Sequence, residues 1–257
     1  IDASRHSGKT VVAEDLDNDG NIDLVIGNRM VPQKYPLPEP SYVLWNRKGV
    51  FTKQLISDLI EGYEDNIVND IAIADLNSDG RKDIVLVGDW SKPKLLMNVE
   101  KGWLEDQSLQ GESGLWFSCA IVDINNDGNQ DIILGNIGEN SKHKATTDKP
   151  LRIYGGDIDD NGTWDMYLSK KWKGKFVPMR GKECSTDQMP FVSEKARGHQ
   201  SGKAWCLDSI FDSERNESTI LTKHPTAECA LIMHGHNIII SDPHLPLRWP
   251  WVFKSSQ

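Results

Sequence analysis

The sequence predicts an all-β protein, and three observations support this class. Short apolar runs rich in β-branched residues recur along the first two thirds of the chain. The motif Asp-x-[Asp/Asn]-x-[Asp/Asn]-Gly-x-x-Asp separates these runs four times, and an apolar residue stands at position 12 of every copy. Continuous β-branched runs of this length are typical of strands that are covered on both faces. We therefore expect each motif to be the turn of a β-hairpin.

Strands are expected on both sides of every motif. The runs before the motifs are residues 11–13, 71–74, 120–122 and 151–154. The runs after them are residues 24–26, 84–87, 132–134 and 166–168. A second hairpin follows each of the first two motifs, with strands at 42–46 and 50–52 and at 95–98 and 103–104. Each of these units then has four strands with the motif between its first two, which is the composition of a propeller blade.

The spacing of the motifs is irregular. Their first residues are Asp15, Asp75, Asp123 and Asp157, so the intervals shorten from 60 to 48 to 34 residues. The first two intervals fit a blade plus insertions, whereas the last is too short for one. We place the fourth motif in the second hairpin of the third blade, with 151–154 as its third strand and 166–169 as its fourth. The alternative is a truncated third blade followed by a new one. The insertions 31–40 and 138–150 are expected to be surface loops.

The motif has the chemistry of a calcium loop. Oxygen atoms at positions 1, 3 and 5 converge on one hard cation if the chain turns sharply, and glycine at position 6 permits that turn. Position 7 offers its backbone carbonyl, so Arg81 is compatible there, because its charge is expected to point away from the site while its carbonyl binds. The predicted ligands at positions 1, 3, 5, 7 and 9 are Asp15, Asp17, Asp19, Asn21, Asp23, Asp75, Asn77, Asp79, Arg81, Asp83, Asp123, Asn125, Asp127, Asn129, Asp131, Asp157, Asp159, Asn161, Thr163 and Asp165.

Two other interpretations of the motif carry less weight. An EF-hand needs a glutamate at position 12, where this chain has Ile26, Leu86, Leu134 and Leu168, so these loops are not EF-hands. Asp, Asn and Gly also dominate ordinary turns. Four copies that all carry the carboxylate at position 9 favour Ca²⁺ over a plain turn, because so many clustered negative charges repel one another without a cation.

Composition limits the remaining possibilities. The chain has 257 residues, 38 of them acidic and 29 basic, with a formal charge of −9. Without a Lys/Arg-rich stripe it is a poor candidate for binding nucleic acid. Since no apolar run approaches the ~18 residues of a membrane span, we expect no membrane insertion. The chain begins at Ile1, from which we expect a processed chain or a fragment. Of the four cysteines, Cys119 lies in an apolar run and is expected to be a free buried thiol.

On these motifs the chain resembles the FG-GAP/VCBS repeats of integrin α-subunit propellers and of bacterial secreted proteins with a neighbouring ASPIC/UnbV region. The resemblance covers roughly residues 8 to 195, and residues 180–191 look like a stretch that follows the repeats in some large members. It implies a β-propeller with structural calcium, a secreted, periplasmic or cell-surface location, and a protein or glycan ligand. Integrin-type propellers have seven blades. About three to four are visible here, so the propeller is expected to be partial or atypical.

The chain is divided into residues 1–195, the propeller blades, and residues 196–257, an unassigned tail in which 238–240 is expected to be one strand. Near matches to enzyme motifs fail. Residues 111–114 lack the last glycine of a nucleophile elbow, and residues 198–203 are one residue short of a phosphate loop. The tail residues His234, His236, Asp242 and His244 are ligands that a transition metal could use, although surface histidines are the commoner outcome.

We therefore expect a calcium-binding extracytoplasmic module with an adhesion-like binding or scaffold role in preference to an enzymatic one. The alternative is the propeller portion of a secreted carbohydrate-active or other hydrolytic enzyme. If the chain binds a ligand, binding is expected on the insertions between blades, where Tyr35, Tyr42, Trp90 and Trp116 could reach solvent. The competing interpretation is that these aromatic residues pack inside the blades.

Overall fold

The structure is a computed structural model that describes residues 6–107, 109, 113–137, 145, 149–157, 161–181, 185–187 and 238–241. Regular structure in these residues is almost entirely β-strand in antiparallel pairs, so the all-β prediction is confirmed. No described helix is long and apolar enough to cross a membrane.

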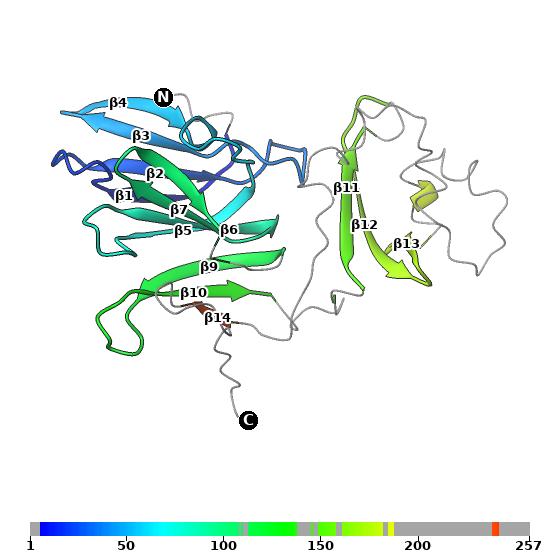
Figure 1. The fold of residues 1–257 in the computed structure, drawn as a ribbon. Helices are drawn as coiled ribbons and strands as arrows, with labels where there is room; N and C mark the ends of the chain where they lie inside the picture. The colour runs from blue at the N-terminus through cyan, green and yellow to red at the C-terminus, as the bar shows by residue number, and fades with distance from the viewer. Residues whose placement is uncertain are drawn as a thin grey trace.

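Three sheet units follow one another along the chain (Figure 1). Unit 1 comprises β1 (Gly8–Glu14), β2 (Asp23–Asn28), β3 (Tyr42–Arg47) and β4 (Val50–Leu55). Unit 2, which follows the 3-10 helix η1 (Ile56–Asp58), comprises β5 (Ile67–Ala74), β6 (Asp83–Ser91), β7 (Lys94–Val99) and β8 (Gly102–Asp106). Unit 3 comprises β9 (Gly114–Val122), β10 (Asp131–Asn136) and β14 (Ile238–Ser241). A short pairing between β6 and β9 joins units 2 and 3 into one sheet.

The motif is the turn between the first two strands of every unit. The residues at position 6 (Gly20, Gly80, Gly128 and Gly162) all have φ between +81° and +91°. Only glycine adopts this backbone without strain, which is why the motif requires it. The residues at position 4 of the first three motifs, Asn18, Ser78 and Asn126, have φ between +58° and +60°. The loops therefore have similar backbone conformations at these positions.

Apolar side chains from facing sheets form the core between the units. Val25 and Val43 of unit 1 pack with Ile71, Ile84 and Leu86 of unit 2. Units 2 and 3 pack in the same way, through Val85, Leu95, Trp116, Ile132 and Leu134. The core therefore lies in layers between successive sheets.

The fourth motif does not lie where we expected it. Strands β11 (Leu151–Gly156), β12 (Asp165–Trp172) and β13 (Lys175–Pro178) form a three-stranded sheet of their own, in which β11 pairs with β12 and has no pairing with β10. Placing 151–154 as the third strand of the third unit was wrong, and the alternative of a new unit is correct.

The third-strand position of unit 3 belongs to β14 instead, and the strand expected at 238–240 is thereby confirmed. Its register on β10 matches that of β3 on β2 and of β7 on β6. The residue after the position-9 aspartate pairs with Ser241 in unit 3, with Leu44 in unit 1 and with Leu96 in unit 2. The rest of residues 196–257 lies outside the described part of the chain.

The insertion at 31–40 is only partly a surface loop. Residues 32–34 are exposed, but Pro36, Pro38 and Glu39 are buried. Trp164 donates its indole N–H to the carbonyl of Tyr35 at 2.8 Å. A Cβ on Gly155 of β11 would lie 2.7 Å from Cδ of Pro36, so this close approach requires glycine. The insertion therefore joins the β11–β13 sheet to the rest of the molecule. Within 138–150, only residues 145, 149 and 150 are described.

Candidate metal centre

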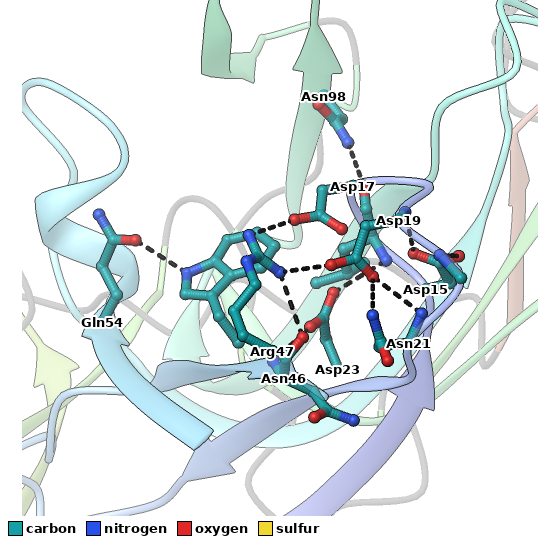
Figure 2. A network of polar contacts seen from close by, with 12 residues as sticks. Asp15, Asp17, Asp19, Asn21, Asp23, Asn46, Arg47, Gln54 and Asn98 are labelled. Carbon is teal, nitrogen blue, oxygen red and sulfur yellow. Dashed lines mark hydrogen bonds and ion pairs between the residues drawn. The ribbon is translucent and has the colours of Figure 1, made fainter. Parts of the chain in front are cut away.

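The first loop brings three carboxylates together, and two of them accept hydrogen bonds from the loop's own backbone (Figure 2). Asp15 accepts the backbone N–H of Asp19 on Oδ1 (3.1 Å) and that of Gly20 on Oδ2 (2.9 Å). Asp19 in turn accepts the backbone N–H of Asn21 at 2.8 Å. As a result, one carboxylate oxygen from each of Asp15, Asp17 and Asp19 lies within 4.8 Å of the others.

The other three loops repeat these bonds. Oδ2 of Asp75, Asp123 and Asp157 accepts the N–H of the position-6 glycine at 2.8, 2.9 and 2.8 Å. Asp79, Asp127 and Asn161 at position 5 accept the N–H of position 7 at 2.9, 2.8 and 2.7 Å. Position 3 is Asn77 in the second loop and Asn125 in the third, so these loops bring fewer carboxylates together, although an amide oxygen is also a calcium ligand. Asp159, predicted at position 3 of the fourth loop, lies outside the described residues.

The carboxylate at position 9 accepts backbone hydrogen bonds from the loop and from the third strand, which the motif alone does not predict. Asp23 accepts the N–H of Leu16 on Oδ2 (3.1 Å) and that of Asn46 on Oδ1 (2.7 Å). Asp83 does the same with Leu76 and Asn98, at 2.9 Å each. Both aspartates are fully buried. They tie the loop to the third strand of the unit.

In the third loop, Asp131 accepts the N–H of Ile124 at 2.9 Å. Each carboxylate oxygen has a second lone pair, so these bonds are compatible with the predicted ligand role of position 9.

Burial raises the pKa of the Asp23 and Asp83 carboxyls, and their backbone hydrogen bonds oppose that effect.

Two arginines supply positive charge to the first two loops. Arg47 Nη2 lies 2.5 Å from Oδ2 of Asp17, and its Nη1 lies 3.1 Å from Oδ2 of Asp19 (Figure 2). Arg81 Nη2 lies 2.6 Å from Oδ2 of Asp79, while its Nε donates to the carbonyl of Asn98 at 2.9 Å. The expectation that the charge of Arg81 points away from the site was wrong. The negative charge of the clustered carboxylates attracts the guanidinium of Arg81.

These charges act together with the loop hydrogen bonds. The side-chain and backbone N–H groups of Asn21 lower the pKa of Asp19, and Arg47 adds to the effect. The backbone N–H of Arg81 is the main cause that lowers the pKa of Asp79. Both carboxyls are thereby held in the ionised form that a cation needs.

The atoms that the loops offer as ligands indicate which kind of cation they suit. Every predicted ligand atom is a carboxylate, amide or carbonyl oxygen, and hard cations such as Ca²⁺ prefer oxygen ligands. The chemistry of the loops therefore fits calcium.

The FG-GAP-like repeat family matches this chain twice, over residues 15–86 and 75–134. Residues 15–134 are FG-GAP-like repeats. The two matched segments span the first three motifs and the strands between them, so the family resemblance inferred from the motifs is confirmed for this part of the chain. No curated protein matches the chain.

Adjacent FG-GAP-like repeats hold each other at the loop end. Asn18 of the first loop donates its side-chain N–H to the carbonyl of Gly80 in the second loop at 3.0 Å. Asn98 of β7 donates to the carbonyl of Leu16 at 2.8 Å. The first two candidate sites are therefore neighbours, joined by one hydrogen bond between the loops and a second one from β7 to the first loop.

The aromatic residues proposed for binding are packing residues of the repeats. Tyr42, Trp90 and Trp116 are buried, with Trp116 only 2% exposed. Tyr35 is half-buried and packs with Trp90, Leu151 and Ile153. The interpretation that these side chains pack inside the protein is therefore correct, and the expectation that they reach solvent was wrong.

A buried polar cluster links the strand ends to the 31–40 insertion, and sequence reasoning missed it. Asp89 accepts hydrogen bonds from Arg29 (2.8 Å), from the Tyr35 hydroxyl (3.2 Å) and from Asn69 (2.7 Å). Trp90 donates its indole N–H to the same hydroxyl. Burial raises the pKa of Tyr35 above its usual range, so this hydroxyl is a donor at neutral pH. Nothing in the local sequence marks these residues, because they come from distant segments.

Proposed function

We propose that this chain is a calcium-binding, extracytoplasmic module of β-propeller type that serves as a binding or scaffold unit, and that its calcium is structural. The observation that carries the proposal is the loop geometry, which all four motifs share. In each, the position-1 aspartate accepts the backbone N–H groups of positions 5 and 6. In the first loop, where the grouping is closest, oxygen atoms of Asp15, Asp17 and Asp19 lie within 4.8 Å of one another.

A structural role for the ion follows from where the ligands come from. Positions 1 to 9 belong to one hairpin, and position 9 in the first two loops also holds the third strand through Asn46 or Asn98. An ion bound to these groups would stiffen the joint between the first three strands of a unit. It would also offset the charge of the clustered carboxylates. We infer that a protein or glycan ligand contacts another part of the surface.

The test is thermal unfolding of the full chain in calcium, in magnesium and in chelator. At ~2 mM calcium and a dissociation constant of ~0.1 mM, mass action contributes about 1.8 kcal/mol per occupied site. The melting temperature should fall by several degrees per site in chelator and recover with calcium more than with magnesium, which dehydrates reluctantly. An unchanged melt in chelator would refute the proposal.

A pair of variants shows whether the loops cause the effect. Asp15→Asn should remove part of the calcium response, because Asp15 anchors the first loop. Asp58→Asn is the matched control, since it neutralises an exposed carboxylate in η1 instead. Equal calcium responses in the two variants would place the metal elsewhere.

A further inference from the structure

We propose that the first two calcium loops bind their ions cooperatively, and that Asn98 of β7 is the positioning residue that couples them. This inference rests on the proposed calcium function and adds to it a dependence of one site on the other. The hydrogen bonds of Asn98 join position 9 of the second loop to the backbone of the first.

The backbone of Asn98 holds the second loop. Its N–H donates to Oδ1 of Asp83, the predicted position-9 ligand, at 2.9 Å. Its carbonyl accepts Nε of Arg81, at position 7, also at 2.9 Å. The other carboxylate oxygen of Asp83 accepts the N–H of Leu76 at 2.9 Å. Asn98 is therefore one of the groups that fix the Asp83 carboxylate in its orientation.

The side chain of Asn98 reaches the first loop (Figure 2). It donates to the carbonyl of Leu16 at 2.8 Å, and the N–H of Leu16 donates to Oδ2 of Asp23 at 3.1 Å. Leu16 is only 1% exposed and packs in the core that units 1 and 2 share. Leu16 and Asn98 thus link the position-9 carboxylates of the two loops, Asp23 and Asp83.

A second hydrogen bond joins the loops in the opposite direction. Asn18 lies between Asp17 and Asp19 in the first loop, and its side chain donates to the carbonyl of Gly80 in the second loop at 3.0 Å. The N–H of Gly80 donates to Oδ2 of Asp75 at 2.8 Å. Each loop is therefore held partly by a side chain of the other repeat.

Asn46 separates the two roles of Asn98, because it is the same residue type at the equivalent place in unit 1. Its N–H donates to Oδ1 of Asp23 at 2.7 Å, as that of Asn98 does to Asp83. Its side chain, however, donates to the carbonyl of Ile22 at 3.0 Å and accepts the N–H of Gly49 at 2.7 Å, both within unit 1. Both asparagines hold position 9 through the backbone, whereas the Asn98 side chain also joins two repeats.

These links predict positive coupling. An ion that orders the first loop fixes Asp23 and Leu16, and through Leu16 it restricts the Asn98 side chain. The second loop then loses less conformational freedom when its own ion binds. Hydrogen-bond partners of metal ligands commonly change metal affinity by about 10–100-fold, so an effect through them is large enough to measure.

Repulsion between the two ions acts against this coupling. At ~0.15 M salt, exposed charges are screened over ~8 Å, which weakens that repulsion. We therefore expect calcium in the first loop to raise the calcium affinity of the second about fivefold at this salt concentration, and the reverse effect to be equal.

The position-6 glycines allow each loop to be followed separately. Gly20 and Gly80 donate their N–H groups to Asp15 and Asp75, so their amide signals in NMR spectra should shift as calcium enters. Isotopic labelling of glycine alone limits the spectrum to the 21 glycines of the chain. Asp15→Asn disables the first loop, and the calcium response that disappears identifies Gly20. In this variant Gly80 should respond at about fivefold higher calcium than in the wild type.

Two variants break the links between the loops. Asn98→Ala removes the side-chain bond to Leu16 and keeps the backbone N–H that Asp83 accepts. Asn18→Gly removes the other bond at an exposed position whose φ of +58° suits glycine, so it also provides the test if Asn98→Ala fails to fold. When both changes are present, Asp15→Asn should no longer alter the calcium response of Gly80.

Asn46→Ala is the matched control, and the about fivefold dependence of Gly80 on the first loop should persist in it. A purely structural role of Asn98 would alter stability and calcium affinity, but it would leave the dependence of one loop on the other unchanged. The comparison of Asp15→Asn with the wild type in each background isolates that dependence.

The outcomes separate this proposal from the calcium function itself. If Gly80 responds at the same calcium concentration in the wild type and in Asp15→Asn, the coupling is overturned while calcium binding is upheld. If the dependence persists without the side chains of Asn18 and Asn98, the assignment to these residues is overturned. If neither Gly20 nor Gly80 shifts and calorimetry detects no calcium binding, both proposals fail.

Discussion

The guanidinium of Arg47 lies against the carboxylate of Asp17, with Nη2 2.5 Å from Oδ2, although the two residues belong to different hairpins. Arg47 ends β3, whereas Asp17 lies in the turn between β1 and β2. The second hairpin of unit 1 thus supplies a positive charge to the candidate metal loop of the first. A calcium ion that enters the loop competes with this charge for the oxygens of Asp17 and Asp19.

We predict that Arg47→Gln strengthens calcium binding at the first loop. An exposed ion pair is weak, so the dissociation constant should fall by up to about fivefold. Lys48→Gln is the matched control, since it removes the same charge from the adjacent, exposed position of the same turn. Calorimetric titration compares the two variants with the wild type. Weaker binding in Arg47→Gln, or an equal gain in Lys48→Gln, would contradict local competition.

We predict that Asp83→Ala destabilises the protein even in chelator. Its carboxylate satisfies the backbone N–H groups of Leu76 and Asn98 inside the protein, and a buried N–H left without an acceptor costs about 1–3 kcal/mol. The expected loss in unfolding free energy is therefore about 2–4 kcal/mol. Asp75→Ala in the same loop should cost about 1 kcal/mol or less, because water replaces its bonds to the exposed loop backbone.

Urea unfolding in chelator measures both variants. If the position-9 carboxylate acted only through a metal, then Asp83→Ala and Asp75→Ala would lose the same stability once calcium is removed. That result would show that the hydrogen bonds of Asp83 to the third strand contribute little.

The sequence predicts the local part of this structure well. The nine-residue motif contains both the glycine that its turn needs and the side chains that accept the hydrogen bonds of the turn. The apolar runs that form the two strands stand directly beside it. The hairpin can therefore be predicted from residues that are close together in the chain. Gly80 at φ +83° and the bonds to Asp75 are examples. The all-β class and the repeat family follow from the same local information.

Prediction from the sequence fails where contacts link segments that are distant in the chain. Strand β11 is the next strand after β10 in the chain, yet β14, about a hundred residues after β10, pairs with the edge of β10. Arg47 was missed for the same reason, because its partners Asp17 and Asp19 lie in another hairpin. Trp90 and Trp116 could be assigned to solvent or to the core only after the packing between units 2 and 3 and the β11–β13 sheet was known.

We predict that Trp116→Ala lowers the free energy of unfolding by about 3–5 kcal/mol, because it leaves a large cavity in the core between units 2 and 3. Trp172→Ala should change it by less than about 0.5 kcal/mol, since Trp172 is 52% exposed at the end of β12. Chemical unfolding of the two variants in calcium is the measurement. A small effect of Trp116→Ala would mean that Trp116 does not pack as described.

We predict that Cys119 reacts slowly with thiol reagents in the folded protein. Burial raises the pKa of the Cys119 thiol above its usual range, and the negative charge of Asp70 adds to the effect. The thiolate is the reactive form. A free cysteine has a pKa of about 8.5, so at pH 8 an unfolded chain holds a substantial thiolate fraction, whereas folded Cys119 remains almost entirely protonated.

Alkylation by iodoacetamide, followed by mass spectrometry of the peptide that contains Cys119, gives the rate at this one site. The rate in folded protein should keep rising with pH beyond the point where the rate in denaturant levels off. Asp70→Asn should speed the reaction only modestly, because burial is the larger cause of the raised pKa and remains in that variant. If native Cys119 reacted as fast as the denatured chain at pH 8, the packing of β9 against unit 2 would have to be more open than the structure describes.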